Sequence, residues 1–136
     1  MSNCIFCKII AGEIPCFKIY EDENLLAILD RFPSATGHTL IIPKRHAADI
    51  FELNDAEAAG ILPLAKRIAE KIRTELTPDG VNIVQNNGRA AGQEIFHYHM
   101  HIVPRNKNDG LKFNNPPTDP PLNELAKTAE KLKLSE

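Results

Sequence analysis

The chain has 136 residues, of which 43% are hydrophobic and 25% are charged, and its formal net charge at pH 7 is −2. These values are typical of a globular protein, and the length suits a single domain over residues 1–136. They argue against a nucleic-acid polymer as partner, because no block of basic residues is available to displace counterions, although a single nucleotide remains compatible. Lys8 and Glu13 interrupt the apolar start of the chain, so we expect no signal peptide, no membrane span and a cytoplasmic protein.

The first part of the chain predicts a short helix, a hairpin and a third strand. The helix would cover residues 4–11. The stretches "FKIYED" (17–22) and "NLLAILD" (24–30) are rich in apolar residues and separated by charged turn residues, which predicts the hairpin. A third strand is expected in "HTLIIPKRH" (38–46), where Pro43 would stop it.

A long helix is predicted in the middle of the chain. Asn54 and Glu57 have the spacing of a capping box, which opens a helix. Apolar residues then recur at helical spacing through residue 76, and Pro63 should bend the helix early. The recurring residues are Ile61, Ala65, Ile68, Ile72 and Leu76.

The last part predicts two more strands, at 81–87 and 98–104, followed by "FNNPPTDPP" (113–121), whose four prolines exclude regular structure. A final helix is expected at about 121–134, with one apolar stripe made by Leu122, Leu125, Ala129 and Leu132. Strands gathered around one long helix predict an α+β protein with a mostly antiparallel sheet.

The segment "FHYHMHIVPR" (96–105) places His97, His99 and His101 at alternate positions. On an extended strand these three side chains share one face, whereas Tyr98, Met100 and Ile102 point to the other. Metal binding, covalent catalysis and an inert polar face are the three interpretations. The inert face is the weakest of them, because three polar rings on one side gain nothing unless they bind something.

A metal site is one interpretation. The pair Cys4 and Cys7 forms a C-x-x-C, which is a metal half-site or a redox pair, whereas Cys16 stands alone as a small apolar residue. Two histidines would complete a Cys₂His₂ zinc site and leave at least one histidine of the strand free. A zinc hydrolase with Glu94 as base is a weaker alternative, because thiolate ligands make zinc a poorer Lewis acid.

Covalent catalysis fits the histidines best. A neutral imidazole is a nucleophile toward phosphorus near pH 7, and the middle ring, His99, is flanked by two others. Just upstream, "NNGRAAGQE" (86–94) contains Gly88 and Gly92, where backbone N–H groups can approach phosphate oxygens closely. The pattern therefore favours attack on a phosphate.

Several stretches of the sequence, the histidine segment among them, resemble a known family. The stretch "HYHMHIV" matches the histidine triad pattern, and "CIFCKIIAGEIP", "GHTLIIPKRH" and "NNGRAAGQEIFHYHMHIVPR" resemble the bacterial Hit proteins of the Hint branch of the histidine triad (HIT) superfamily. The resemblance covers about residues 3–105, and residues 106–136 would add the proline-containing segment and the C-terminal helix. It implies a HIT-like fold with a five-stranded, mostly antiparallel sheet, one long helix and short terminal helices.

The resemblance also implies a function. Family members act as hydrolases or transferases at the α-phosphate of a nucleotide, usually a purine, and typical substrates of the branch are nucleoside phosphoramidates. His99 would form a nucleotidyl-histidine intermediate, His101 would bind the phosphate or leaving-group oxygen, and His38 would support the triad. The alternatives are a Fhit-like dinucleoside polyphosphate hydrolase and a nucleotide-binding or scaffold protein with vestigial turnover.

Further residues are implied by matching positions. Asp30 would bind the ribose hydroxyls. The apolar wall around the base would be Ile5, Phe6, Ile9 and Leu29, and the phosphate-contacting loop would be Asn86, Gly92, Gln93, Glu94 and Ile95. A structural zinc would be held by Cys4, Cys7, His46 and His97. The protein would form a homodimer through the long helix and a strand, with the sheet continuing across the interface.

The chain departs from the family pattern at three places. Glu94 stands where animal Hint proteins carry a serine, and a carboxylate there should turn away or meet Arg89 or Arg105. Arg31 replaces the usual aliphatic residue after the ribose-binding acid. The chain contains no tryptophan, so it lacks the Trp-containing C-terminal segment of animal Hint proteins.

Overall fold

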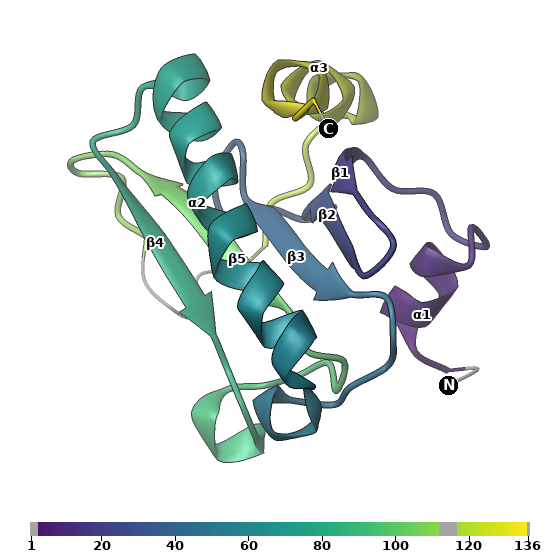
Figure 1. Cartoon of the computed structure of the whole chain (residues 1–136). Coiled ribbons are helices and arrows are strands. Elements are labelled where there is room, and N and C mark those ends of the chain that lie inside the picture. Colours follow the sequence, from purple (N-terminus) through teal and green to yellow (C-terminus); the bar gives the residue numbers. More distant parts are fainter. Residues whose placement is uncertain (1–2, 112–116, 136) are drawn as a thin grey trace.

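The computed structural model describes residues 3–111 and 117–135. Over these residues five strands form one antiparallel sheet in the order β1-β2-β3-β5-β4, with β1 and β4 at the edges (Figure 1). The strands are β1 (Lys18–Glu21), β2 (Leu25–Leu29), β3 (Thr39–Pro43), β4 (Gly80–Gln85) and β5 (Met100–Arg105). The predicted α+β class and five-stranded antiparallel sheet are confirmed.

Three α-helices accompany the sheet in the described part: α1 (Ile5–Ile10), α2 (Asp55–Leu76) and α3 (Leu122–Leu132), with short 3₁₀ turns η1 (Ile50–Glu52) and η2 (Arg89–Ala91). The long helix α2 lies across one face of the sheet, and α3 lies beyond the strands near β1 (Figure 1). The predicted capping box is present, because Asn54 Oδ1 accepts from the Glu57 N–H at 2.8 Å and Glu57 Oε1 accepts from the Asn54 N–H at 2.9 Å. In the described part of the chain, no helix combines the length and the apolar character that crossing a membrane requires.

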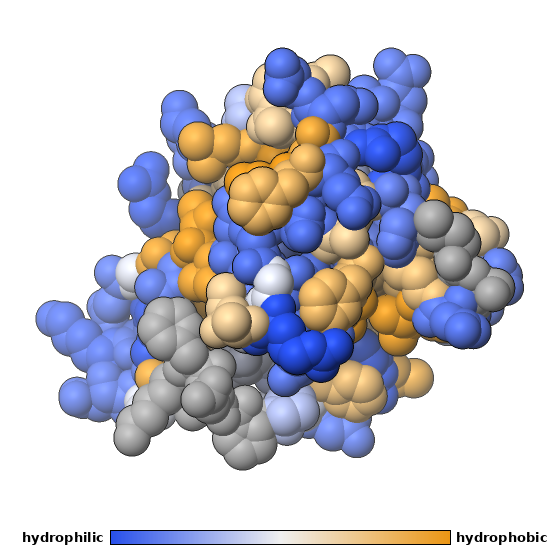
Figure 2. All heavy atoms as spheres, turned by 90° about the horizontal axis from the view of Figure 1, so that it is seen from below, coloured by the Kyte–Doolittle hydropathy of each residue, from blue (hydrophilic) through white to orange (hydrophobic). Residues whose placement is uncertain are grey.

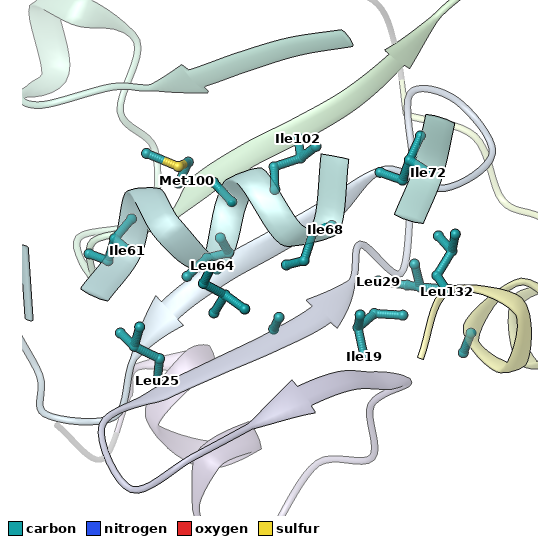
Figure 3. Packing of buried hydrophobic residues seen from close by; sticks show 14 of the residues in the cluster. Ile19, Leu25, Leu29, Ile61, Leu64, Ile68, Ile72, Met100, Ile102 and Leu132 are labelled. Atoms are coloured by element: carbon teal, nitrogen blue, oxygen red, sulfur yellow. The ribbon is translucent and has the colours of Figure 1, made fainter. Parts of the chain in front are cut away.

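The main core lies between the sheet and α2. Figure 3 shows Ile61, Leu64, Ile68 and Ile72 of α2 facing side chains of the strands, with Leu132 of α3 closing one end. The helical spacing predicted Ile61, Ala65, Ile68 and Ile72 of α2 and Leu132 of α3, and all five are buried, whereas the predicted Leu76 is only half-buried. Leu64 is also buried, although it was not predicted. A second, smaller cluster lies on the opposite face under α1, and consists of Phe6, Leu26, Ile28, Leu40 and Ile42.

The predicted stripe of α3 needs one correction. Leu125, Ala129 and Leu132 are buried, but Leu122 is 57% exposed. The reason is that Leu122 is the first residue of the helix, a turn before the part that packs on the core, and Thr128 fills the inner face instead. In the predicted irregular segment 113–121, residues 113–116 lie outside the described residues, and residues 117–121 have no regular structure.

Candidate functional site

The three alternating histidines do not all lie on a strand. The strand β5 begins at Met100, so His97 and His99 precede it. The prediction of one continuous strand over 98–104 is wrong at its start, because the Tyr98 N–H bonds to the Ala47 carbonyl at 2.7 Å and draws the chain off the sheet there. The alternation persists nonetheless.

The rings gather on one side of the chain. The Phe6 ring lies 5.8 Å from His97 and 5.1 Å from His99, and the His99 and His101 rings lie 4.9 Å apart, measured between centroids. Tyr98, Met100 and Ile102 point the other way, into the main core. A run of extended backbone therefore separates polar from apolar side chains as the spacing predicts.

The backbone around His99 determines which of its ring nitrogens is free. His99 Nδ1 lies 2.8 Å from the His97 carbonyl oxygen. Because a carbonyl only accepts, Nδ1 must carry the proton and donate it, which leaves a lone pair on Nε2. Burial lowers the pKa of His99, so the neutral ring is favoured. The middle histidine thus presents an unprotonated nitrogen.

A chain of hydrogen bonds orients His101 in the opposite sense. The Ser34 N–H donates to His38 Nδ1 at 3.0 Å, so the proton of a neutral His38 lies on Nε2. His38 Nε2 then donates to His101 Nδ1 at 2.9 Å, and the remaining proton of His101 lies on its own Nε2. Burial lowers the pKa of both rings to about 4. The pair therefore stays neutral near pH 7, with one N–H donor available on His101.

Asp30 lies beside this pair. Its Oδ2 is 3.6 Å from His38 Nε2, its Oδ1 accepts from the Phe32 N–H at 2.9 Å, and burial raises the pKa of its carboxyl. Asp30, His38 and His101 place three potential metal ligands within 4.8 Å of one another. The hydrogen bonds do not favour a cation there. The Ser34 N–H donates to His38 Nδ1, so the proton of His38 lies on Nε2, and Nε2 is the nitrogen that would have to bind the cation.

A second cluster has the chemistry of a metal site. The ligand atoms of Cys4, Cys7, His46 and His97 lie within 4.8 Å of one another. His97 Nδ1 is 3.4 Å from Cys4 Sγ and 3.6 Å from Cys7 Sγ, and His46 Nδ1 is 3.3 Å from Cys7 Sγ. Zinc bonds of about 2.0–2.3 Å in a tetrahedron require edges of roughly 3.3–3.8 Å. The donor atoms therefore fit this geometry.

The tautomer of His97 fits a metal as well. Its Nε2 lies 2.8 Å from the Pro43 carbonyl, so Nε2 carries the proton and Nδ1 offers its lone pair to the cluster. His46 Nδ1 approaches this same Nδ1 to 3.2 Å, where two lone pairs would repel unless a proton or a cation lay between them. Burial raises the pKa of the Cys7 thiol, and a bound Zn²⁺ would reverse that preference. The predicted set could thus hold a zinc ion.

The loop before the histidines is held in place by Gln93. Its Oε1 accepts from the Gly88 N–H at 2.8 Å, and its Nε2 donates to the Ala48 and Ile95 carbonyls at 2.6 and 3.0 Å. Gln93 is buried, and its side chain holds the loop through these bonds. Gly92 has φ +97°, a conformation that favours glycine.

The remaining predicted residues of this loop lie around it. Asn86 and Ile95 are half-buried, whereas Gly92 and Glu94 are exposed. Glu94 turns outward, and within the described residues it forms no ion pair with Arg89 or Arg105. Arg105 binds Asp109 at 2.9 Å, and the Arg89 guanidinium lies 5.4 Å from the centroid of the Phe96 ring.

The apolar wall differs from the prediction at Leu29. In the sheet register Ile28 pairs with Leu40, Leu40 with His101 and His101 with Val84, and these four residues define what we call the histidine face. Leu29 is one residue further on, so its side chain points to the opposite face and joins the core under α2 (Figure 3). The side chains that line the histidine face beside Phe6 are Ile28 and Leu40, which sequence reasoning missed.

A period-two count would have found both residues. Ile28 lies two positions before Asp30, and Leu40 lies two positions after His38. The other predicted wall residues come from α1, where Phe6 is buried, Ile9 packs against the smaller cluster and Ile5 is 44% exposed.

Arg31 turns toward the C-terminal segment. Its guanidinium lies 3.2 Å from Asp119 Oδ1 and 4.7 Å from the centroid of the Phe32 ring. The Thr118 N–H donates to the Pro33 carbonyl at 3.3 Å. Arg31 thus helps to tie residues 118–119 to the loop that leads to His38.

Comparison with known proteins identifies the family. The profile of the HIT domain matches residues 11–108. The chain belongs to the HIT family. It is 53% identical over 110 residues to the protein Hit of Bacillus subtilis, with 80% of this chain and 76% of that protein covered. HIT proteins are nucleotide-binding hydrolases and transferases.

Two further HIT proteins are informative. The adenosine 5′-monophosphoramidase hnt1 of Schizosaccharomyces pombe is 48% identical over 110 residues, with 80% of each chain covered. A zinc-bound histidine triad family protein from Mycobacterium smegmatis has the same fold, with a TM-score of 0.86, 41% identity and coverage of 97% of this chain and 91% of that one. This HIT chain therefore shares its architecture with a member whose structure contains zinc.

Proposed function

We propose that this HIT protein is a nucleotide phosphoramidase, which hydrolyses purine nucleoside phosphoramidates at the α-phosphate through a nucleotidyl-histidine intermediate. One observation carries the proposal: the hydrogen bond from His99 Nδ1 to the His97 carbonyl leaves Nε2 unprotonated, beside the N–H donor of His101. The similarity to the monophosphoramidase of S. pombe supports the choice of substrate class.

The first step follows from these tautomers. His99 Nε2 attacks phosphorus, a P–N bond to the histidine forms, and the P–N bond to the leaving amine breaks. The amine takes its proton from solvent and departs as a neutral molecule. The positive charge that develops on the His99 ring is stabilised by the His97 carbonyl, which accepts from Nδ1–H. His101 Nε2–H donates to the phosphate oxygen or the leaving nitrogen.

The second step returns the enzyme to its starting state. Water attacks the phosphorus of the intermediate, the His99–phosphorus bond breaks, and the nucleoside monophosphate is released. His99 Nε2 regains its lone pair, and the proton of the attacking water goes to solvent. The hydrogen bond between His38 and His101 keeps the His101 donor in place throughout both steps.

The nucleotide would lie across the histidine face. The ribose hydroxyls would bind the Asp30 carboxylate, and the base would pack on Ile5, Phe6, Ile9, Ile28 and Leu40. The phosphate would lie against the loop of Asn86 and Gly92–Ile95. Gln93 would contribute indirectly, because its side-chain amide is hydrogen-bonded to the backbone of Gly88, Ala48 and Ile95 and so holds that loop in shape.

A zinc ion held by Cys4, Cys7, His46 and His97 would have a structural role. Its chemistry would be to cross-link α1 to the segment that carries the histidines. Cys4 caps α1, and Phe6 of α1 contacts both His97 and His99. A zinc ion that holds α1 in place would therefore also hold Phe6 against the His99 ring.

A comparison of two substrates tests the proposal. The protein should release ammonia from adenosine 5′-phosphoramidate with a kcat/KM at least tenfold above that for diadenosine polyphosphates. The reverse preference would assign it to the dinucleoside polyphosphate hydrolases. Binding of both compounds without turnover of either would identify a nucleotide-binding protein instead.

A further inference from the structure

A single threonine of the C-terminal segment holds the loop that precedes β3. The hydroxyl and the N–H of Thr118 both donate to the Pro33 carbonyl, the N–H at 3.3 Å. Figure 1 shows the segment before α3 passing beside the loop that joins β2 to β3. Pro33 is buried, so its carbonyl needs a partner within the protein. In the described part of the chain, Thr118 supplies both hydrogen bonds that this carbonyl accepts.

The other end of the same peptide group contacts the histidines. The Pro33 carbonyl and the Ser34 N–H belong to one rigid peptide plane, and that N–H donates to His38 Nδ1 at 3.0 Å. Hydrogen bonds at both ends of a peptide group polarise and strengthen one another. Thr118 is therefore linked to His38 through a single peptide plane, and His38 Nε2 lies 2.9 Å from His101 Nδ1.

The loop is not packed tightly on the side of α3. A cavity of about 370 Å³ lies beside residues 33–38, and α3 forms one of its walls. Packing alone therefore does not fix the Pro33–Ser34 peptide from that side. The Arg31 guanidinium, 3.2 Å from Asp119 Oδ1, also joins this loop to the C-terminal segment. The Asp119 side chain is 74% exposed, however, and an exposed ion pair is a weak constraint.

The nitrogen of His38 that carries the proton decides what His101 can do. With the proton on Nε2, His38 donates to His101, and His101 keeps its own proton on Nε2. With the proton on Nδ1, His38 Nε2 would have to accept from His101, so His101 would carry its proton on Nδ1. His101 would then present a lone pair to the phosphate in place of an N–H. The Ser34 N–H disfavours this second arrangement, because two N–H groups would then point at one another.

We propose that Thr118 is a positioning residue of this site. It holds the Pro33–Ser34 peptide where the Ser34 N–H faces His38 Nδ1, and through His38 it keeps an N–H on the phosphate side of His101. The proposal rests on the proposed phosphoramidase function and deepens it by adding a residue that acts only through others. Thr118 lies outside residues 11–108, which the HIT profile matches, so this support comes from the C-terminal part of the chain.

The kinetic test compares Thr118→Val with Thr118→Ser in the hydrolysis of adenosine 5′-phosphoramidate. Valine keeps the shape of threonine without the hydroxyl. Thr118→Val should therefore lower kcat by about tenfold and leave KM within about twofold, because a misplaced His101 donor weakens the transition state more than substrate binding. Thr118→Ser keeps the hydroxyl and should recover kcat to within about threefold of the wild type. Thr74→Val is the matched control, because the Thr74 hydroxyl also donates to a backbone carbonyl, that of Glu70, but on the exposed side of α2, and both constants should be unchanged.

A second measurement reports the positions of the protons and does not depend on turnover. In ¹H–¹⁵N NMR spectra of the histidine rings, His38 of the wild-type protein should show an unprotonated Nδ1 and a protonated Nε2. In Thr118→Val the two nitrogen shifts of His38 should move toward one another, because the second tautomer becomes populated. Thr118→Ser and Thr74→Val should give the wild-type shifts.

Several results would overturn the positioning role of Thr118. They are a proton on His38 Nδ1 in the wild-type protein, ring shifts that Thr118→Val leaves unchanged, and a loss of kcat in Thr118→Val that Thr118→Ser fails to recover. Failure of the wild-type protein to hydrolyse the phosphoramidate would overturn the proposed function instead. The spectra of His38 would then still decide whether Thr118 holds the proton in place.

Discussion

At the scale of single residues, the triad is defined by where its protons lie. His97, His99 and His101 are chemically identical, yet each has a different acceptor or donor at one ring nitrogen: the Pro43 carbonyl, the His97 carbonyl and His38. Each fixed nitrogen determines the task left to the other. His97 offers a lone pair to the cysteine cluster, His99 offers a free lone pair on Nε2, and His101 offers a proton on Nε2.

The buried pair His38 and His101 predicts an acid-sensitive fold. A histidine whose pKa falls from 6.5 in the unfolded chain to about 4 in the fold binds no proton in between, whereas the unfolded chain does. The free energy of unfolding should therefore be fully retained above pH 6.5 and fall as the pH drops toward 4, by at most about 3 kcal/mol for His38. Urea unfolding at several pH values measures this slope.

His38→Asn is the matched variant, because its Oδ1 can accept from the Ser34 N–H in place of Nδ1. The slope between pH 6.5 and 4 should become shallower in this variant. An unchanged slope would show that His38 does not titrate between the folded and unfolded states.

At the scale of elements, the site depends on how short segments approach one another. The loop before β3 passes close to α2 and β5 at Gly37, whose φ is +92°. A Cβ atom there would lie 2.5 Å from Leu76 Cδ1 and 3.2 Å from Pro104 Cγ. The next residue is His38, so this close approach also places the histidine that orients His101.

Gly37→Ala should destabilise the protein by roughly 2–4 kcal/mol, because it combines an unfavourable backbone conformation with overpacking. It should also lower kcat/KM by shifting His38. Gly80→Ala is the control, because nothing lies within 4 Å of its added Cβ, and it should change stability by less than about 0.5 kcal/mol. Thermal unfolding of both variants decides the matter, and equal midpoints would contradict the prediction.

The helix α1 is the element that zinc would hold. Cys7→Ser should reduce bound zinc below a few tenths of an equivalent and destabilise the fold by roughly 2 kcal/mol or more, because binding free energy contributes to folding. Cys16→Ser, outside the cluster, should keep both zinc and stability. The measurements are metal analysis of protein purified without added zinc, and thermal unfolding with and without chelator. Full stability of metal-free protein would refute the structural role.

Local features were predictable from the sequence, and features that depend on distant partners were not. The Asn54–Glu57 capping box and the apolar spacing of α2 involve neighbours in the chain, and both are confirmed. The C-x-x-C pointed to a metal half-site, but spacing alone did not identify His46 and His97 as its partners, and only the family resemblance did. The role of Gln93 depends on the Ala48 carbonyl, 45 residues away, and no local pattern reveals it.

The histidine strand shows the same division. Alternation placed His97, His99 and His101 on one side of the chain, because side-chain direction is a local property. It did not show that the strand begins only at Met100, since that start depends on the bond from Tyr98 to Ala47. The face of Leu29 was misassigned although a period-two count would have corrected it.

At the scale of the whole molecule, the main core and the candidate site lie on opposite faces of the sheet. The helix α2 and the main core cover one face, and His101, His38 and Asp30 lie on the other. Apolar side chains are also exposed in several places. Figure 2 shows apolar side chains between hydrophilic residues on the face seen from below. Independently of that view, Leu62 of α2 and Ile83 of the edge strand β4 are 62% and 43% exposed.

We expect a homodimer that covers these two residues. Ile83 pairs with Ile102 in the sheet, so it lies on the face that α2 covers, at an edge with unpaired backbone groups. Sedimentation should give twice the chain mass of 15.1 kDa. Ile83→Asp should shift the protein toward monomer at micromolar concentration, whereas Leu122→Asp, at an exposed position at the start of α3, should not. A monomeric wild-type protein would contradict the expectation.

The covalent intermediate on His99 is the central claim, and trapping it is the most direct test. Protein mixed with adenosine 5′-phosphoramidate and quenched rapidly in base should carry one adenylyl group, and peptide mapping by mass spectrometry should place it on His99. His99→Ala should lose both the adduct and turnover while still binding the nucleotide. An adduct on another residue, or turnover retained in His99→Ala, would contradict the account.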